Sequence, residues 1–123
     1  KYLDHNAISR ILKTEPTGIG VKGEQIRKDK PDFFYKDSFC EYRTATIETF
    51  YADDVLKSIY RFLLPAVDEL SEYVKERKLY VKFYLKLEYY DNSFPAVTLD
   101  KKFIDICHKI GAEVDQDVYI YKD

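Results

Sequence analysis

The chain has 123 residues, the usual length of one domain, and its 46% hydrophobic and 34% charged residues are typical of a folded globular protein. A net charge of −2 disfavours a dedicated nucleic-acid-binding domain, and no apolar run is long enough for a transmembrane helix. Two cysteines are too few for a disulfide-stapled secreted domain. We therefore expect one cytoplasmic domain over residues 1–123 that needs no cofactor and contacts no membrane.

The N-terminal part of the chain predicts one helix followed by turns. Apolar residues at helical spacing predict a helix over His5–Leu12, which Asp4 or Asn6 caps and which ends before Pro16. Three glycines after this helix predict turns around one short strand, Ile19–Ile26.

A charged segment then leads to a second expected strand. The segment Asp29–Asp37, which contains Pro31, is predicted to be a loop. Its aromatic run Phe33–Tyr35 is expected to fold back onto the core. Residues of high β-propensity predict a strand over Tyr42–Tyr51, which is expected to form a hairpin or meander with the strand before it.

The central part of the chain has the clearest periodicity. An apolar stripe predicts a long helical segment from Asp53 or Asp54 to about Lys78, and Pro65 is expected to kink or divide it. Period-two alternation then predicts a strand over Leu79–Tyr89 with one buried and one solvent-exposed face.

The C-terminal part predicts a turn, a helix and a last strand. The turn is expected at Asp91–Ser93, and the helix is expected to be capped by Thr98 and to end at Gly111. The strand is expected over Ala112–Tyr121. The predicted fold is therefore α+β, a small mixed, mostly antiparallel sheet with helices packed on one face.

Tyrosines and aspartates on the last two predicted strands form the candidate partner-binding surface. The strand alternation places these residues on the outer faces: Tyr80, Tyr84, Asp115, Asp117, Tyr119 and Tyr121. If the two strands are neighbours, the tyrosines form one patch, and tyrosine is enriched at protein interfaces. In the alternative interpretation, a loop or helix covers this face, and the two acids are solvated charges that discourage edge pairing.

The sequence offers no convergent catalytic set. Cys107 and His108 are adjacent on a predicted helix and therefore do not face each other, and neither cysteine has the spacing of a zinc site. The glycine-rich segment 18–23 does not match a phosphate-binding loop. We expect neither a catalytic residue nor a bound metal. The alternative is a cation bound by Asp115, Asp117 and a distant acid such as Glu88.

Several short motifs together resemble a known family. They are Glu15-Pro16-Thr17, Lys22-Gly23-Glu24, Ile110-Gly111-Ala112 and the strand from Val114 to Tyr119. The order of elements around them resembles the bacterial domain-of-unknown-function family 4279 over nearly the whole chain. The resemblance implies a fold and no activity. It also implies a strand before the first helix, so a short strand upstream of Lys1 is expected, and a tryptophan that this chain lacks.

The favoured hypothesis is a non-enzymatic interaction domain, most concretely an immunity protein that binds and neutralises a cognate bacterial toxin. Acidic side chains such as Asp115 and Asp117 would pair with a basic cleft of the toxin. The alternatives are a metal-dependent hydrolase and a small-ligand or single-strand binder on the tyrosine face. Single-strand binding usually requires a basic groove, which the charge distribution does not predict, so no nucleic-acid partner is expected.

Overall fold

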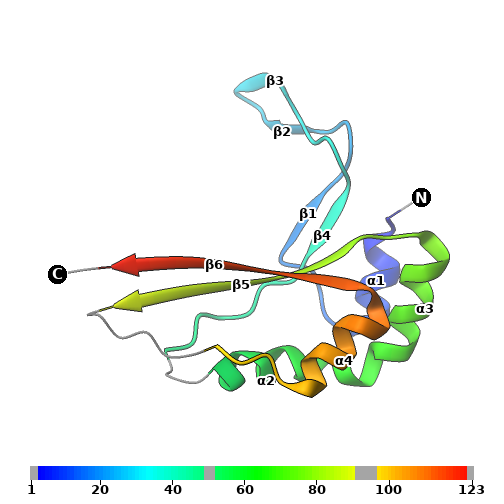
Figure 1. Ribbon diagram of the computed structural model, residues 1–123. Coiled ribbons are helices and arrows are strands. Elements are labelled where there is room, and N and C mark those ends of the chain that lie inside the picture. Colours follow the sequence, from blue (N-terminus) through cyan, green and yellow to red (C-terminus); the bar gives the residue numbers. More distant parts are fainter. Residues whose placement is uncertain (1–2, 49–51, 91–96, 122–123) are drawn as a thin grey trace.

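The computed structural model describes residues 3–48, 52–90 and 97–121, and its helices and strands follow one another as labelled in Figure 1. In chain order they are α1 (His5–Leu12), β1 (Gly18–Gly20), β2 (Gln25–Arg27), β3 (Lys30–Phe34), β4 (Phe39–Glu41), α2 (Ala52–Leu63), the 3-10 turn η1 (Leu64–Ala66), α3 (Val67–Arg77), β5 (Val81–Tyr90), α4 (Lys101–Ile110) and β6 (Ala112–Tyr121). This composition confirms the predicted α+β class.

The described strands form three separate pairs. β1 pairs with β4 and β2 pairs with β3, both antiparallel, while β5 and β6 run parallel. Parallel neighbours need a crossover between them, and here α4 supplies it. The strand pairs are thus mostly antiparallel, as predicted, although the longest pair is the parallel one.

Helix α1 has the predicted bounds and the predicted cap. Asp4 Oδ1 accepts hydrogen bonds from the backbone N–H groups of Asn6, at 3.0 Å, and Ala7, at 3.4 Å. These bonds satisfy donors that have no partner inside the first turn. The helix ends where Lys13 adopts a left-handed conformation with φ 55°.

The long helical segment is divided at Pro65, as predicted. Pro65 lies inside η1, between α2 and α3, because its ring removes a hydrogen bond and clashes with the preceding turn of an α-helix. Ser71 of α3 is buried and its hydroxyl donates to the carbonyl of Lys109 at 2.7 Å. Lys109 also forms an ion pair with Asp68, so α3 and α4 are joined by polar contacts as well as apolar packing.

Helix α4 differs from the prediction at its start. Its N-cap is Asp100 and not Thr98, and Asp100 Oδ1 accepts from the backbone N–H of Phe103 at 2.9 Å. Asp100 also accepts from the Tyr60 hydroxyl of α2, a tertiary contact that a threonine cap two residues earlier would not make. The helix ends at Gly111, as predicted, with φ 77°.

The hydrophobic core lies between the helices and one face of the β5–β6 pair. Phe103 of α4 is fully buried, and its ring meets Phe83 of β5 edge-on with 5.2 Å between centroids. The buried cluster also contains Leu56 of α2, Ile110 of α4 and Leu85 of β5. The β5–β6 face that contacts these residues is called the inner face below, and the opposite side is called the outer face.

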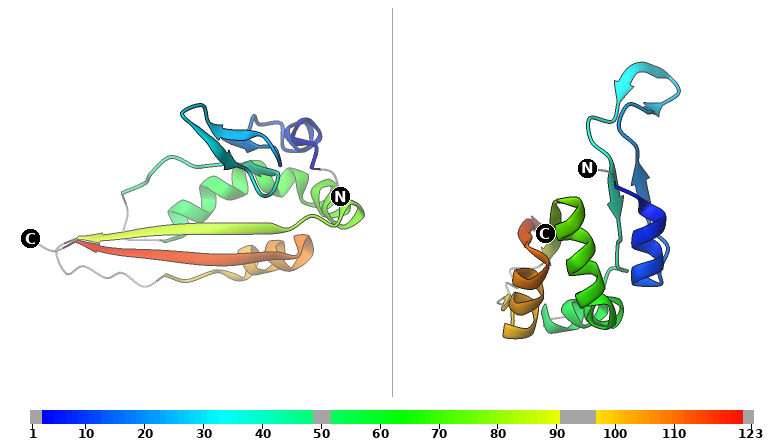
Figure 2. Two further views of the ribbon diagram at one scale, coloured as in Figure 1. Left: turned by 90° about the horizontal axis from the view of Figure 1, so that it is seen from above. Right: turned by 90° about the vertical axis from the view of Figure 1, so that its right-hand side faces the viewer.

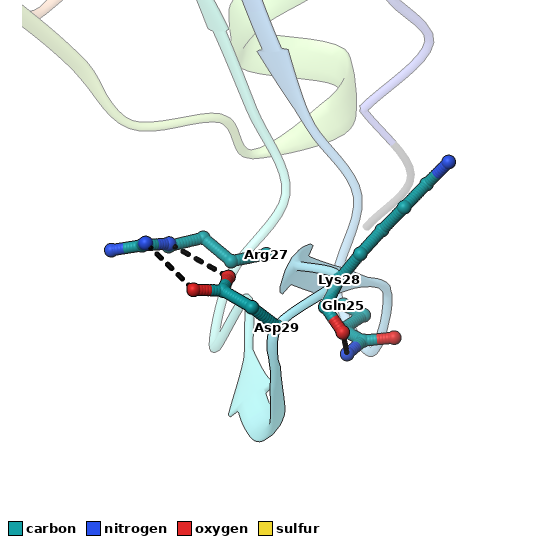
Figure 3. Close-up of polar contacts among 4 residues, drawn as sticks. All are labelled: Gln25, Arg27, Lys28 and Asp29. Atoms are coloured by element: carbon teal, nitrogen blue, oxygen red, sulfur yellow. Dashed lines mark hydrogen bonds and ion pairs between the residues drawn. The ribbon is translucent and has the colours of Figure 1, made fainter.

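The region before α2 departs most from the predictions. The segment Asp29–Asp37, predicted as a loop, contains β3, which forms a hairpin with β2 around Lys28 and Asp29. At its tip the guanidinium of Arg27 binds both carboxylate oxygens of Asp29, at 3.1 and 2.8 Å, as Figure 3 shows. The predicted strand Ile19–Ile26 is split into β1 and β2, because Gly23 turns the chain between them with φ 89°.

The aromatic run Phe33–Tyr35 was predicted to fold onto the core, and this prediction is wrong. Phe33 and Phe34 are 53% and 51% exposed, because the β2–β3 hairpin projects away from the helices (Figure 1). Only Tyr35 is half-buried, with its ring against Phe39. Strand pairing satisfies the hairpin backbone without any contact to the core.

The prediction of a strand over Tyr42–Tyr51 is also wrong for the residues that the structure describes. The strand β4 ends at Glu41, and residues 42–48 form neither helix nor strand. Their high β-propensity is not enough, because a strand also needs a neighbour to pair with. Glu41 is paired with Gly18, the first residue of the antiparallel strand β1, so the residues after Glu41 lie beyond the start of β1. Residues 49–51 lie outside the described residues, as does the turn predicted at Asp91–Ser93.

Candidate partner-binding face

The register of β5 and β6 places the candidate residues on one face. Tyr84 lies beside Asp115, Lys86 beside Asp117, and the pairing continues without a shift to Tyr90 beside Tyr121. Because side chains alternate along each strand, residues two apart share a face. The outer face therefore carries Tyr80, Lys82, Tyr84, Lys86, Glu88, Tyr90, Glu113, Asp115, Asp117, Tyr119 and Tyr121.

The outer face is open to solvent. Tyr80 and Tyr84 are 67% and 65% exposed, and the three other outer-face tyrosines are exposed as well. The left view of Figure 2 shows β5 and β6 in front of α2, with the hairpin to one side. The covered-face interpretation therefore does not hold among the described residues, and the tyrosines are available to a partner.

A polar network joins the two strands at the end where the helices lie. Lys82 Nζ is 3.0 Å from Asp115 Oδ2, across the strand pair, and the Tyr80 hydroxyl donates to Glu113. The same ammonium lies 5.5 Å from the ring centroid of Tyr80 and 5.4 Å from that of Tyr84, within cation–π distance. The Lys82 ammonium thus contacts the Asp115 carboxylate and two tyrosine rings at once.

A second group of contacts occupies the far end of the strands. The rings of Tyr90 and Tyr121 stack with 4.8 Å between centroids and 11° between planes. The Tyr90 hydroxyl donates to Glu88 Oε2 at 3.1 Å, and Lys86 Nζ lies 3.2 Å from Glu88 Oε1. Lys86 also lies 5.4 Å from the ring centroid of Tyr119. These contacts hold the tyrosine rings in fixed orientations without burying them.

The electrostatics of the outer face are acidic. It carries four carboxylates and two lysines, an excess of two negative charges. The hydrogen bond to Asp115 raises the pKa of Lys82, and the hydrogen bonds from Lys86 and Tyr90 lower the pKa of Glu88. Lys82 and Glu88 are therefore both charged at neutral pH. Among the described residues, Asp117 has no ion-pair partner, so its charge is available to a binding partner.

The structure brings all six sequence-predicted site residues to one surface. It also adds residues that the sequence prediction missed: Tyr90, Glu113 and the two lysines that bind the acids. Tyr90 was missed because the predicted strand ended at Tyr89, although one further alternation would have included it. Glu113 lies two residues before Asp115, so the same alternation would have placed it on this face. The contact between Lys82 and Asp115 required knowledge of the parallel register, which no local pattern supplies, whereas Lys86 and Glu88 lie two residues apart on the same strand.

The geometry offers little to catalysis or metal binding. Within the described ranges, no group of three or more histidine, cysteine, aspartate or glutamate side chains could hold a metal ion. Asp115 is bound to Lys82 and Glu88 to Lys86, so neither presents a free carboxylate beside Asp117. Burial raises the pKa of the Cys107 thiol, which favours its protonated, weakly nucleophilic form. The described helices also contain no apolar stretch long enough to span a membrane.

Comparison with known families identifies the chain. It matches the model of the domain of unknown function DUF4279 over residues 1–121, and the chain therefore belongs to this family. The resemblance inferred from the motifs is confirmed. No curated protein and no solved structure gives a match. The family description assigns no activity, so the function is inferred from the outer face.

Proposed function

We propose that this domain is an interaction module that binds a protein partner through the outer face of β5 and β6. The observation that supports this most directly is the gathering of five exposed tyrosines on one face, oriented by hydrogen bonds to glutamates, cation–π contacts with lysines and ring stacking. Tyrosine supplies a large contact area at a low cost in side-chain entropy, and rings that are already oriented lose less on binding.

The charge of the face favours a basic partner. An excess of negative charge accelerates encounter with a positive surface and makes the association rate depend on salt. The same charge disfavours a nucleic-acid partner, whose phosphates it would repel. The most concrete partner is a bacterial toxin with a basic active-site cleft, which the domain would neutralise as an immunity protein by covering that cleft.

The test compares variants of the outer face with matched variants elsewhere. Tyr84→Ala and Asp117→Asn remove an exposed ring and a charge that has no ion-pair partner in the described residues. Phe33→Ala, in the exposed hairpin, and Glu72→Gln, on the exposed side of α3, are the matched controls. Tagged wild-type and variant domains are used side by side to capture partners from the source cell, and affinity for the captured protein is then measured by calorimetry.

We expect Tyr84→Ala to weaken binding of the partner by about 2 kcal/mol, as for a central interface residue. Asp117→Asn should lower mainly the association rate and the salt dependence, with a few-fold loss of affinity. Both controls should bind like the wild type, and all four variants should keep the wild-type melting temperature. Full affinity of Tyr84→Ala together with loss of binding in Phe33→Ala would move the interface to the hairpin and refute the proposal.

A further inference from the structure

The edge of β6 that points away from β5 has no paired strand among the described residues. Over the described residues β6 pairs with β5 alone, so one side of its ten residues has N–H and C=O groups that no other strand contacts. The left view of Figure 2 shows β6 on the side of β5 that faces away from the strands β1 to β4. An edge of this length is a ready template for another strand.

Strand β6 lacks most of the features that usually protect an edge strand, and the charged side chains that it does carry are all acidic. Proteins place proline, glycine bulges, lysine or very short strands at such edges. The segment Ala112–Tyr121 contains no proline, glycine or lysine, and its register with β5 has no shift. Strand β5, by contrast, carries Lys82 and Lys86. The two strands therefore differ, and β6 is the one whose backbone admits a neighbour.

The charges on β6 define which neighbour it admits. Glu113, Asp115 and Asp117 follow one another at every second position, and the strand has no basic residue. Pairing with β6 of a second copy would place acids opposite acids, which is destabilising. A strand with basic residues at alternate positions would instead form cross-strand ion pairs. Lys82 and Asp115, 3.0 Å apart, show that such a pair forms between neighbouring strands here.

Apolar residues on the inner face of β6 add a second requirement. Val118 and Ile120 are 51% and 54% exposed, whereas Leu87 and Tyr89, their neighbours on β5, are half-buried. The uncovered apolar surface therefore lies on the β6 side of the pair. An added strand would place its own inward side chains beside Val118 and Ile120 and remove this surface from water.

We propose that β6 accepts an extended segment of a partner protein as a third strand, and that this segment alternates basic with apolar residues. Its basic side chains lie on the outer face beside Glu113, Asp115 and Asp117, and its apolar side chains lie beside Val118 and Ile120. Main-chain hydrogen bonds supply affinity and the alternating side chains supply specificity, as in other cases of strand addition. The inference rests on the proposed function, because it names the chemistry of the partner.

The experiment uses the full chain and a synthetic peptide that alternates valine and lysine over the length of β6. Amide hydrogen exchange is measured residue by residue by NMR, with and without saturating peptide. Successive N–H groups of a strand point to opposite sides, so strand addition should protect every second amide of β6. We expect exchange at those amides to slow by about tenfold or more, with little change at the amides already bonded to β5.

Two control peptides make the result specific. One carries glutamate in place of every lysine. The other has proline at its centre, which lacks a backbone N–H donor and interrupts pairing in the middle of a sheet. Neither should protect β6. Equal protection by the glutamate peptide would refute the basic partner, and equal binding of the proline peptide would refute strand pairing.

Three further outcomes would also overturn the inference of strand addition. Peptide binding without alternating protection, or no binding at all, would overturn the inference. Protection of the same amides by raising the protein concentration alone would assign the edge to a second copy, and would overturn it as well. The proposed function fails separately, when Tyr84→Ala binds the captured partner as tightly as the wild type does.

Discussion

The two halves of the β5–β6 pair have the same sequence pattern and different surroundings. In the first half, Val81, Phe83 and Leu85 of β5 and Val114 of β6 pack against the core cluster. In the second half, Val118 and Ile120 continue the same alternation and are exposed. Alternation thus shows which way a side chain points, and only the covering element decides whether it is buried.

The lengths of the elements explain the difference. Ten residues of strand span roughly 33 Å, whereas the ten residues of α4 span roughly 15 Å of helix. One crossover helix of this length therefore covers only about half the length of β6, whose far half carries the exposed Val118 and Ile120. Figure 1 shows β5 and β6 extending well past α4 on the side of the C-terminus. The uncovered half leaves the backbone edge and apolar side chains available for a partner.

The largest expected effect comes from removing the side chain that anchors the covered half. Phe103 is fully buried and contacts Phe83, so Phe103→Ala leaves a cavity under the strands. We expect it to lower the free energy of unfolding by about 3–5 kcal/mol, measured by urea denaturation. Ile104→Ala, at an exposed neighbouring position on α4, should change it by less than about 0.5 kcal/mol. Similar losses for both would show that α4 is not packed as described.

A smaller effect is expected at the residue that ends α4 and starts β6. Gly111 has φ 77°, a conformation that costs other residues about 1–2 kcal/mol. No atom lies within 4 Å of an added Cβ, so Gly111→Ala should cost only this backbone strain. Gly111→Asn should cost less, since asparagine tolerates the left-handed region. Thermal unfolding of both variants checks the order, and a tolerated alanine would contradict the left-handed junction.

The cap of α4 gives an effect that depends on pH. Hydrogen bonds from the Tyr60 hydroxyl and from the Phe103 N–H hold the pKa of Asp100 below its ordinary value of 3.8. A depressed pKa in the folded state means that the stabilisation is present above 3.8 and is lost as the pH falls through the lower, folded-state value. We expect Asp100→Ala to cost about 1 kcal/mol at neutral pH.

The same cost should shrink when unfolding is measured at a pH below the ordinary pKa of Asp100. Asp100→Asn is the control, because asparagine keeps an acceptor for the Phe103 N–H without the titrating group. It should retain most of the stability and lose the pH dependence that belongs to this position. A cost of Asp100→Ala that stays constant with pH would contradict the charged cap.

Local signals predicted the helices and the strands beside the site. The apolar spacing of His5–Leu12 and the glycine at 111 are short-range features, and the structure reproduces both. The alternation from Leu79 onward placed Tyr80 and Tyr84 on the exposed face, because burial of one face imposes a period of two. The predicted face is therefore real as a geometric feature.

Strand partners could not be predicted, because pairing is a property of residues far apart in sequence. The hairpin of β2 and β3 turns at Lys28 and Asp29, which lack the asparagine or glycine that usually marks a tight turn. Conversely, residues 42–48 have the composition of a strand, but no strand of the described residues pairs with them. The parallel direction of β5 and β6 likewise depends on the path of α4.

The smallest expected effect separates the two halves directly. Val114 and Val118 lie four residues apart on the same face of β6, the first half-buried against the core and the second exposed. Valine to threonine preserves shape and β-propensity while adding a hydroxyl that is costly only when buried. We expect Val114→Thr to cost about 1 kcal/mol and Val118→Thr to change the free energy of unfolding by less than about 0.5 kcal/mol. Urea denaturation of the two variants in parallel measures the difference. Equal costs would mean that Val118 is covered in the free domain, which would remove the open half of the strand pair and, with it, the apolar surface that a third strand would cover.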